Sequence, residues 1–255
     1  MDLRGNTILI TGAGSGIGMG FAGAFAQHDN NVIVAVRSPE KAENAARKGL
    51  AVEEADVSDL DSIQALAARM SQKYPSLNVV MNNAGISSYE NLLEGVDTKR
   101  QAAIIVTNVL GYMRVSQAFL PHLLRQKTAT ILNVSSALAF VPNAQQPSYC
   151  ATKAAIHSYT QSLRYQLKDT HVAVIELMPP YVQTSILGEQ QAHDPHAQPL
   201  DEYIEQAMAI LEHEPNAHEV VVERARALRF AADGGSKNYD AAYEQYNSRA
   251  AASAH

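Results

Sequence analysis

The 255-residue chain contains no tryptophan, a single cysteine and no long apolar run. One cysteine, Cys150, cannot form an internal disulfide, which is typical of proteins in a reducing compartment. Residues 1–10 contain no long apolar segment of the signal-peptide kind. The longest apolar stretches are far shorter than the ~20 residues that span a bilayer. These absences predict a cytoplasmic protein that has no membrane partner.

Long basic runs are absent as well. The chain has 20 lysines and arginines against 26 acidic residues, which gives a formal net charge of -6. Its basic residues are scattered, which argues against a nucleic-acid partner and favours a small-molecule substrate. Hydrophobic residues make up 46% of the chain and charged residues 18%. This composition suits a large core, and we expect one domain over residues 1–255.

Short apolar runs alternate with longer segments of helical period along the chain. The runs predict strands at 6–11, 32–36, 51–55, 78–82, 130–135 and 172–177, and residues 219–222 either add a seventh strand or begin a helix. Helices are predicted from residues 38 and 59 and over 98–126, 148–168 and 200–212. Strands apolar on both faces suit a parallel sheet covered by helices. We therefore expect a doubly wound α/β fold with six or seven strands.

Two segments have no clear period. Residues 183–200 are rich in Gln, His, Pro and Asp and predict a loop beside the substrate. Residues 219–255 predict an irregular C-terminal extension with a turn at 233–235 and a short helix near 240–246. His193 and His196 in the loop could share a helix face, but no third ligand has a convincing place. We therefore predict no metal site.

A glycine cluster lies between the first strand and the first helix. Its residues are Gly12, Gly14, Ser15, Gly16, Ile17 and Gly18. Glycines there let the backbone approach a pyrophosphate, and the helix N-terminus supplies free N–H groups. A tight turn without a ligand is the alternative interpretation. The strand–turn–helix context favours a dinucleotide-binding Rossmann fold.

The second predicted strand ends at Arg37 and Ser38, where NAD-binding sites carry an acidic residue for the ribose hydroxyl. An arginine attracts a 2′-phosphate, and a carboxylate would repel it. The sequence therefore predicts NADP (NADPH) as the preferred cofactor. NAD remains possible, because Arg37 could be an ordinary solvated loop residue.

Tyr149 and Lys153 are four residues apart on a predicted helix and therefore share one face. A nearby ammonium lowers the pKa of a phenol, so we expect Lys153 to make Tyr149 an acid/base near neutral pH. The pair alone occurs often by chance. Ser136 ends the fifth strand 13 residues earlier (149 − 136), and the adjacent Ser135 is expected to be structural. Cys150 is expected to be a packing residue rather than a nucleophile.

Six motifs in order over residues 6–184 together resemble the short-chain dehydrogenase/reductase family. They are the Gly12-x-x-x-Gly16-x-Gly18 loop, Asp56-Val57, Asn82-Asn83-Ala84-Gly85, Asn108, Ser136 with Tyr149 and Lys153, and Val182-x-Thr184. The resemblance implies an oxidoreductase that transfers a hydride between nicotinamide and a carbonyl or alcohol. It also implies the catalytic roles. Tyr149 gives the proton, Lys153 binds the nicotinamide ribose, Ser136 binds the carbonyl oxygen, and Asn108 holds a water that links Lys153 to solvent.

The remaining family positions concern the cofactor. By resemblance Asp56 and Val57 meet the adenine, Val182 and Thr184 reach the carboxamide, and the cofactor also touches Asn83, Ala84, Gly85 and Pro179. Pro180 replaces the usual glycine after the sixth strand and puts one main-chain contact in doubt.

The double proline and the segments Leu138–Pro142, Tyr149–Ala155 and Gln166–Thr170 are similar to reductases of the D-alanine-transfer operon. Relatives form homodimers or homotetramers through the helices at 98–126 and 148–168, which we expect here too. An NAD(H)-preferring dehydrogenase and a nucleotide-binding sensor without turnover are the alternatives.

Overall fold

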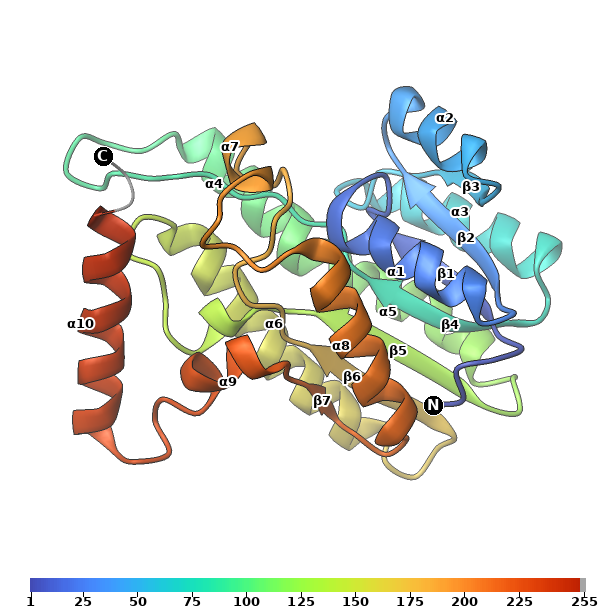
Figure 1. Ribbon diagram of the computed structural model, residues 1–255. Coiled ribbons are helices and arrows are strands. Elements are labelled where there is room, and N and C mark those ends of the chain that lie inside the picture. The colour runs from blue at the N-terminus through green and yellow to red at the C-terminus, as the bar shows by residue number, and fades with distance from the viewer. Residues whose placement is uncertain (253–255) are drawn as a thin grey trace.

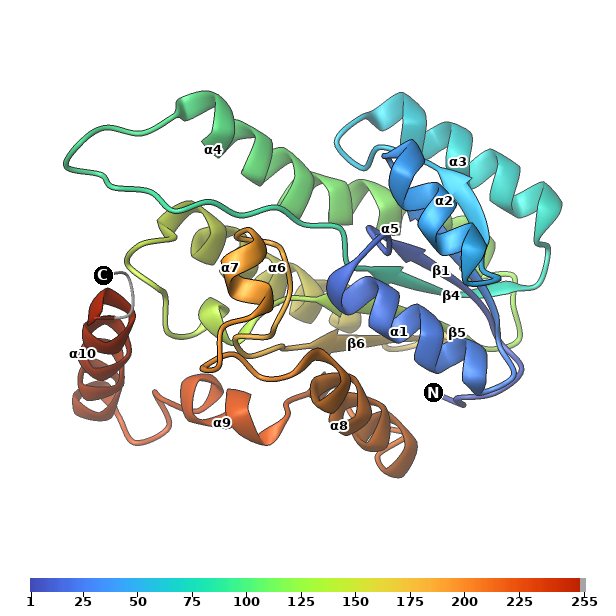
Figure 2. The ribbon, with the colours of Figure 1, turned by 45° about the horizontal axis from the view of Figure 1, so that its top comes forward.

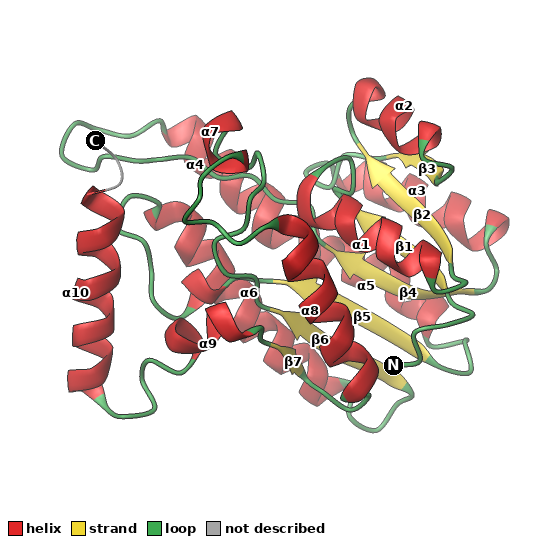
Figure 3. Cartoon of the chain, in the orientation of Figure 1, coloured by secondary structure: helices red, strands yellow, loops and turns green. Residues whose placement is uncertain are grey.

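A seven-stranded sheet runs through the centre of the molecule (Figure 1, Figure 3). The computed structural model describes residues 1–252. The strands are β1 (Thr7–Thr11), β2 (Asn31–Val36), β3 (Ala51–Glu54), β4 (Leu77–Asn82), β5 (Ala129–Val134), β6 (Val172–Leu177) and β7 (Glu219–Val220). All neighbouring strands pair in parallel, in the order β3-β2-β1-β4-β5-β6-β7. The predicted parallel α/β fold is confirmed, and Glu219–Val220 forms the seventh strand.

Helices cover both faces of the sheet (Figure 2). The helices of the molecule, besides α4 and α5, which are described below, are α1 (Gly16–Gln27), α2 (Pro39–Arg47), α3 (Leu60–Lys73), α6 (Pro147–Gln166), α7 (Glu189–Ala192), α8 (Leu200–His213), α9 (Glu223–Arg229) and α10 (Ser236–Ala252), and α10 does not lie on the sheet. On one face α1 packs on α8, where the ring of Phe21 meets the edge of Tyr203 at 6.1 Å between centroids. On the other face α3 and α5 pack together around Ile63, Leu66 and Phe119. Each face of the sheet therefore has its own apolar core.

The helix predicted over 98–126 is interrupted in the structure. It consists of α4 (Thr98–Ile105), a π-helical turn η1 (Val106–Leu110) and α5 (Gly111–Leu123). Residues 98–123 are long and apolar enough to cross a membrane by length and composition. Tyr112, Val115 and Phe119 are nonetheless buried in the protein, so this is a core helix. π-turns inside α-helices occur most often at functional sites.

The prediction of a plain loop over 183–200 was partly wrong. The segment contains α7, and Val182 pairs with Gln198 in an isolated parallel bridge. Gln198 also donates its backbone N–H to Tyr181 O at 2.8 Å and accepts from Gln183 N at 2.8 Å. These backbone bonds close the segment into a compact flap, which local composition did not reveal.

The prediction of an irregular C-terminal extension was also wrong. Residues 219–252 form β7, α9 and α10, and of these features the seventh strand and the turn at 233–235 were predicted. The short helix expected near 240–246 is longer, over Ser236–Ala252, because its sequence is rich in alanine, the best helix former. Residues 253–255 of the predicted extension lie outside the described part of the chain.

The sheet order changes direction between β1 and β4, and this determines where a ligand can bind. From β1 the chain builds outward to β2 and β3, and then returns to place β4 on the other side of β1. The crevice outside the carboxyl ends of strands at such a reversal is the usual ligand site of α/β sheets. The predicted glycine cluster follows β1, and the predicted Asn83–Gly85 segment follows β4.

Candidate active site

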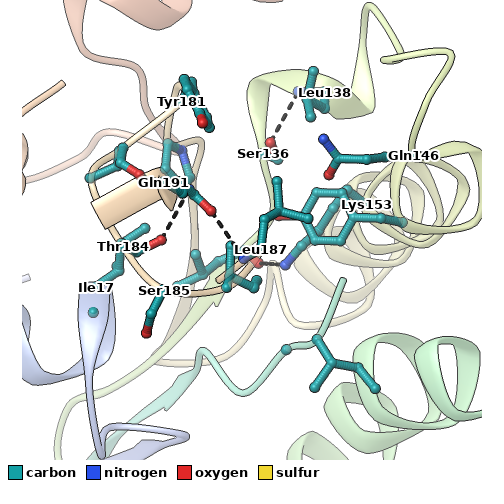
Figure 4. A pocket seen from close by; sticks show the side chains of 18 of the residues that line it. Ile17, Ser136, Leu138, Gln146, Lys153, Tyr181, Thr184, Ser185, Leu187 and Gln191 are labelled. Atoms are coloured by element: carbon teal, nitrogen blue, oxygen red, sulfur yellow. Dashed lines mark hydrogen bonds between the residues drawn. The ribbon is translucent and has the colours of Figure 1, made fainter. Parts of the chain in front are cut away.

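A cavity of about 1080 Å³ opens at the carboxyl ends of the strands. It is lined by every residue that the sequence predicts for the site except Gly18 and Asn108. Segments far apart in sequence therefore meet in one place. Figure 4 shows Ser136, Gln146 and Lys153 facing the pocket from one side and Thr184 and Gln191 from the other.

The glycine cluster brings the loops after β1 and β4 into direct contact. Gly12 and Gly16 have φ of +67° and +55°, a backbone region that favours glycine. A Cβ at Gly12 would lie 2.5 Å from the Cα of Ala84. Asn83 completes the contact, because its Nδ2 donates to Thr11 O at 3.0 Å and to Gly12 O at 3.2 Å.

Gly18 lies behind the cavity wall. A Cβ there would lie 2.4 Å from Asn83 Nδ2, so this glycine permits the contact between loop and helix. Helix α1 begins at Gly16 and aims its free N–H groups at the cavity. The loop therefore fits a pyrophosphate for two reasons. The glycines leave room for the ligand beside the backbone, and the N-terminus of α1 is the positive end of the helix dipole.

Arg37 lines the cavity beyond the end of β2. Its Nη1 lies 3.3 Å from Asp56 Oδ2, and the Asp56 carboxylate also accepts from the backbone and hydroxyl of Ser58 at 2.8 and 2.6 Å. Burial raises the pKa of Asp56, but the hydrogen bonds from Ser58 and Arg37 outweigh it and the pKa falls below its ordinary value. Asp56 is therefore a carboxylate that orients the Arg37 guanidinium.

Lys41 adds a second cation that the sequence reasoning missed. It lies on α2 and lines the cavity beside Arg37 and Ser38. A Cβ at Gly14 would lie 2.6 Å from Lys41 Cβ, so the lysine stem packs on the glycine loop. The sequence did contain a sign of this role, because Lys41 lies in the first turn of the helix predicted to follow Arg37 and Ser38.

Ser136 and Tyr149 lie together at the inner end of the cavity. Ser136 is 5% exposed, and its Oγ accepts from Leu138 N at 3.1 Å. Burial raises the pKa of Tyr149, and a hydrogen bond with the Ser136 side chain only partly offsets this. Tyr149 is therefore a neutral phenol at neutral pH. The lowering of this pKa that we expected from Lys153, whose Nζ lies 5.6 Å from the Tyr149 ring centroid, is outweighed by the effect of burial.

Lys153 is buried beneath the same site. Its Nζ donates to Val134 O at 2.8 Å and lies 5.3 Å from the ring centroid of Tyr112. Burial lowers the pKa of Lys153 to about 7, against an opposing effect of the Glu176 carboxylate. The ammonium is thus close to its titration point in the physiological range.

Asn108 lies in the π-turn and links two segments. Its Nδ2 donates to Ile86 O at 2.9 Å and to Thr152 Oγ1 at 3.1 Å, and its Oδ1 accepts from Ile86 N at 2.9 Å. The side chain thereby joins the loop after β4 to helix α6. Among these contacts none goes to Lys153, and the water link expected from resemblance stays a prediction.

Gln191 is a further residue that sequence reasoning did not find. It is 6% exposed, and its Nε2 donates to Val182 O at 2.8 Å and to Thr184 Oγ1 at 3.1 Å (Figure 4). Its Oε1 accepts from Leu187 N at 3.1 Å. One amide thus fixes the flap over residues predicted to reach the carboxamide.

The two neighbouring alternatives are structural. The Ser135 hydroxyl lies 3.4 Å from Leu177 O and is 1% exposed. Cys150 is 3% exposed, and burial raises the pKa of its thiol to about 11. Both are therefore packing residues, as the sequence predicts.

Three ligand-bearing side chains cluster outside the cavity. The ligand atoms of His157, Glu176 and Glu219 lie within 4.8 Å of one another. Arg229 already binds both Glu219 oxygens, at 2.9 and 3.0 Å, and His157 Nδ1 is 2.9 Å from Glu176 Oε2. We interpret the cluster as a network in which Arg229 of α9 forms an ion pair with Glu219 of β7 and His157 of α6 contacts Glu176 of β6.

The profile of the family described as short chain dehydrogenase matches residues 6–195. The chain therefore belongs to the short-chain dehydrogenase/reductase family of NAD(P)-dependent oxidoreductases. It is 35% identical to the uncharacterized oxidoreductase DltE of Bacillus subtilis over 98% of this chain and 99% of that protein.

Solved structures show the same fold with cofactors bound. A short chain dehydrogenase from Burkholderia cenocepacia in complex with NADP superposes with a TM-score of 0.83 and 25% identity, over 95% of this chain and 99% of that one. A 3-ketoacyl-(acyl-carrier-protein) reductase from Brucella melitensis with NADH gives 0.78 and 27%, over 88% and 100%. These complexes support a nicotinamide cofactor for the family without deciding between its two forms.

Proposed function

We propose that this protein is an NADP(H)-dependent reductase of carbonyl compounds, or the corresponding alcohol dehydrogenase. The observation that carries the choice of cofactor is the pair of cations Arg37 and Lys41 beside Ser38 at the end of β2. Two cations and a hydroxyl suit a 2′-phosphate. Asp56 holds the Arg37 guanidinium in place, and Ser58 binds the other oxygen of its carboxylate.

Four groups of the chain would take part in the reaction, two by contact with the substrate and two through Tyr149 and its helix. Tyr149, a neutral phenol with a raised pKa, donates its proton to the substrate oxygen. The Ser136 hydroxyl binds the same oxygen, and Lys153 in its charged form stabilises the phenolate that remains. Asn108 positions helix α6, on which Tyr149 and Lys153 lie, against the loop after β4. The bound nicotinamide supplies the hydride.

Parallel titrations with NADPH and NADH test the cofactor preference. We expect tighter binding of NADPH and a selective loss of NADPH affinity in Arg37→Ala, by about tenfold or more for a lost charge-assisted contact. Arg47→Ala is the matched control, because Arg47 is an exposed arginine at the end of α2, the helix that follows Arg37, and does not line the cavity. Unchanged preference in Arg37→Ala would favour the NAD(H) alternative.

Tyr149→Phe tests turnover. Removing the acid should reduce carbonyl reduction by at least about a hundredfold while NADPH binding persists. Tyr165→Phe, 70% exposed on the same helix, should leave the rate unchanged. A protein that binds NADPH but reduces no carbonyl in either form would instead be a sensor.

We also propose a cytoplasmic homodimer or homotetramer. Ile105, Leu110 and Leu124 are exposed large side chains on or beside α4 and α5. A contact between copies would cover such apolar surface. Light scattering after size-exclusion chromatography measures the assembly directly.

A further inference from the structure

The C-terminal helix α10 forms part of the cavity although it lies apart from the helices that cover the sheet (Figure 1, Figure 2). Ala242, Gln245, Tyr246 and Arg249 of α10 line the cavity. The wall on this side is therefore built by a segment about 100 residues beyond Tyr149.

Asn247 fastens α10 to the segment that precedes α6. Its Nδ2 donates to Pro142 O at 3.1 Å, and its Oδ1 accepts from Ala144 N at 2.7 Å. The same short segment carries Asn143 and Gln146, both buried and both lining the cavity. A single asparagine thus sets the distance between α10 and the substrate side of the site.

Tyr246 extends this wall toward the reacting groups. Burial raises the pKa of Tyr246 to about 12, and its hydroxyl hydrogen-bonds with the Asn143 side chain. It lies within electrostatic range of Tyr149 and Tyr89. Helix α10 therefore contributes a neutral hydroxyl, that of Tyr246, to the cavity on the side of Tyr149, the predicted acid.

Two arginines give this end of the cavity a positive charge. Arg100 Nη2 donates to Ser87 O at 2.7 Å, and Arg224 Nη1 to His196 O at 3.4 Å. Within the described part of the chain, neither guanidinium has a carboxylate within 4.0 Å. The Arg100 contact lies beside Gln146, another residue of the cavity wall, since the Ser87 hydroxyl bonds Gln146 Oε1 at 3.0 Å.

The acidic side chains of this region do not cancel that charge. Asp194 is the carboxylate that lines this end of the cavity in the described residues. It already accepts from the Tyr181 hydroxyl at 3.1 Å and from His196 N at 2.8 Å. A cavity of net positive charge in a chain of net charge -6 favours an anionic ligand.

The family match ends at residue 195. Arg224 and α10 therefore lie beyond the part of the chain that carries the shared nicotinamide site. Such a position suits a role in choosing the substrate rather than in binding the cofactor.

We propose that α10 is the outer wall of the substrate pocket, and that with Arg100 and Arg224 it selects carbonyl compounds that carry an anionic oxygen group, a carboxylate or a phosphate. The proposal rests on the proposed carbonyl reduction. Guanidinium groups bind both anions through paired N–H donors, and the Tyr246 hydroxyl supplies a neutral partner between the anion and the carbonyl.

Matched aldehydes test the charge selection. The probes are 4-formylbenzoate, its methyl ester and 4-formylphenyl phosphate, and the loss of NADPH absorbance reports turnover because each alcohol formed consumes one NADPH and one proton. We expect kcat/KM for an anionic probe to exceed that for the ester by at least about tenfold. The better of the two anions identifies the natural group.

Arginine variants locate the selection. The ratio of kcat/KM for the anionic probe to kcat/KM for the ester should fall toward one in Arg100→Met or Arg224→Met. It should persist in Arg125→Met, whose guanidinium likewise donates to a backbone carbonyl, Pro121 O at 2.8 Å, but lies outside the cavity. An ester reduced as well as the anions, or a preference that survives both substitutions, would overturn the proposal and leave the reductase function standing.

Variants of α10 test the wall itself. Asn247→Ala and Tyr246→Phe should raise KM for the preferred anion severalfold without changing NADPH affinity. Ser248→Ala, an exposed neighbour on the same helix, should change neither. Unchanged KM in both wall variants would show that α10 does not contact the substrate.

If no probe is reduced, a binding measurement tests the anion site separately from carbonyl reduction. Calorimetric titration of the NADP-loaded protein with 4-formylbenzoate would then be compared with Arg100→Met. Binding that Arg100→Met abolishes supports the anion site and refutes reduction. No binding in the wild type refutes the anion site as well.

Discussion

Replacing Lys153 by methionine should stabilise the cofactor-free protein, and more so at low pH than at high pH. Burial lowers the pKa of Lys153 from 10.5 to about 7. At about 1.4 kcal/mol for each pH unit, this corresponds to about 4 to 5 kcal/mol of destabilisation below pH 7. Methionine has a similar length and no charge, and Val134 O keeps the Tyr112 hydroxyl at 3.0 Å as a partner.

The sign follows from proton binding. Between about pH 7 and pH 10.5 the unfolded chain binds the Lys153 proton and the folded chain does not, so the wild type gains stability as pH rises through this window. The advantage of Lys153→Met should therefore be about 4 kcal/mol at pH 7, about 2 kcal/mol at pH 9 and close to zero above pH 10.5.

Urea unfolding of both proteins at several pH values measures this difference. A change in packing shifts all values equally, so the slope against pH is the test. Lys127→Met, at an exposed lysine, should show no such slope. A difference in stability that is constant from pH 7 to pH 9 would refute the lowered pKa of Lys153 in the folded protein.

Three further outcomes follow from the geometry. Gly12→Ala should destabilise the protein and abolish NADPH binding in a calorimetric titration, because the new Cβ would lie 2.5 Å from Ala84 Cα, whereas Gly23→Ala in α1 meets no atom within 4 Å and should raise the midpoint of thermal unfolding slightly. Cys150 should react with a thiol reagent at pH 8 at a rate limited by unfolding, since its pKa is about 11; rapid stoichiometric labelling of the folded protein would contradict this. Gln191→Ala should remove three hydrogen bonds of the flap and speed its proteolysis without lowering the unfolding midpoint by more than a few degrees, and equal cleavage rates would show that the amide does not fix the flap.

The parts of the site that sequence predicted are those fixed by local spacing. Gly12 to Gly18 act through one turn and one helix start, and Tyr149 and Lys153 lie four apart on one helix. Strand periodicity located six strands within a residue or two. These features depend on residues that are close in sequence, and they can therefore be predicted from the spacing of residue types along the chain.

The parts that were missed depend on distant contacts. The role of α10 rests on Asn247, whose partner Ala144 is 103 residues away. The pKa values of Tyr149 and Lys153 depend on burial by the whole fold, and the expected Tyr149 shift consequently had the wrong direction. Helical periodicity also gave no sign of the π-turn at Val106–Leu110, because one added residue hardly disturbs an apolar pattern.

The π-turn has a consequence for how insertions and deletions would act on this protein. Each residue turns an α-helix by about 100°, so one extra residue rotates everything beyond it relative to a regular helix. The insertion lets Asn108 face Ile86 and Thr152 while Phe119, three turns later, still faces the sheet. Deleting one residue here would turn α4, the π-turn and α5 into one uninterrupted α-helix. The buried faces of its two halves would then point in different directions. The helix at this point is therefore sensitive to a change of even one residue in its length.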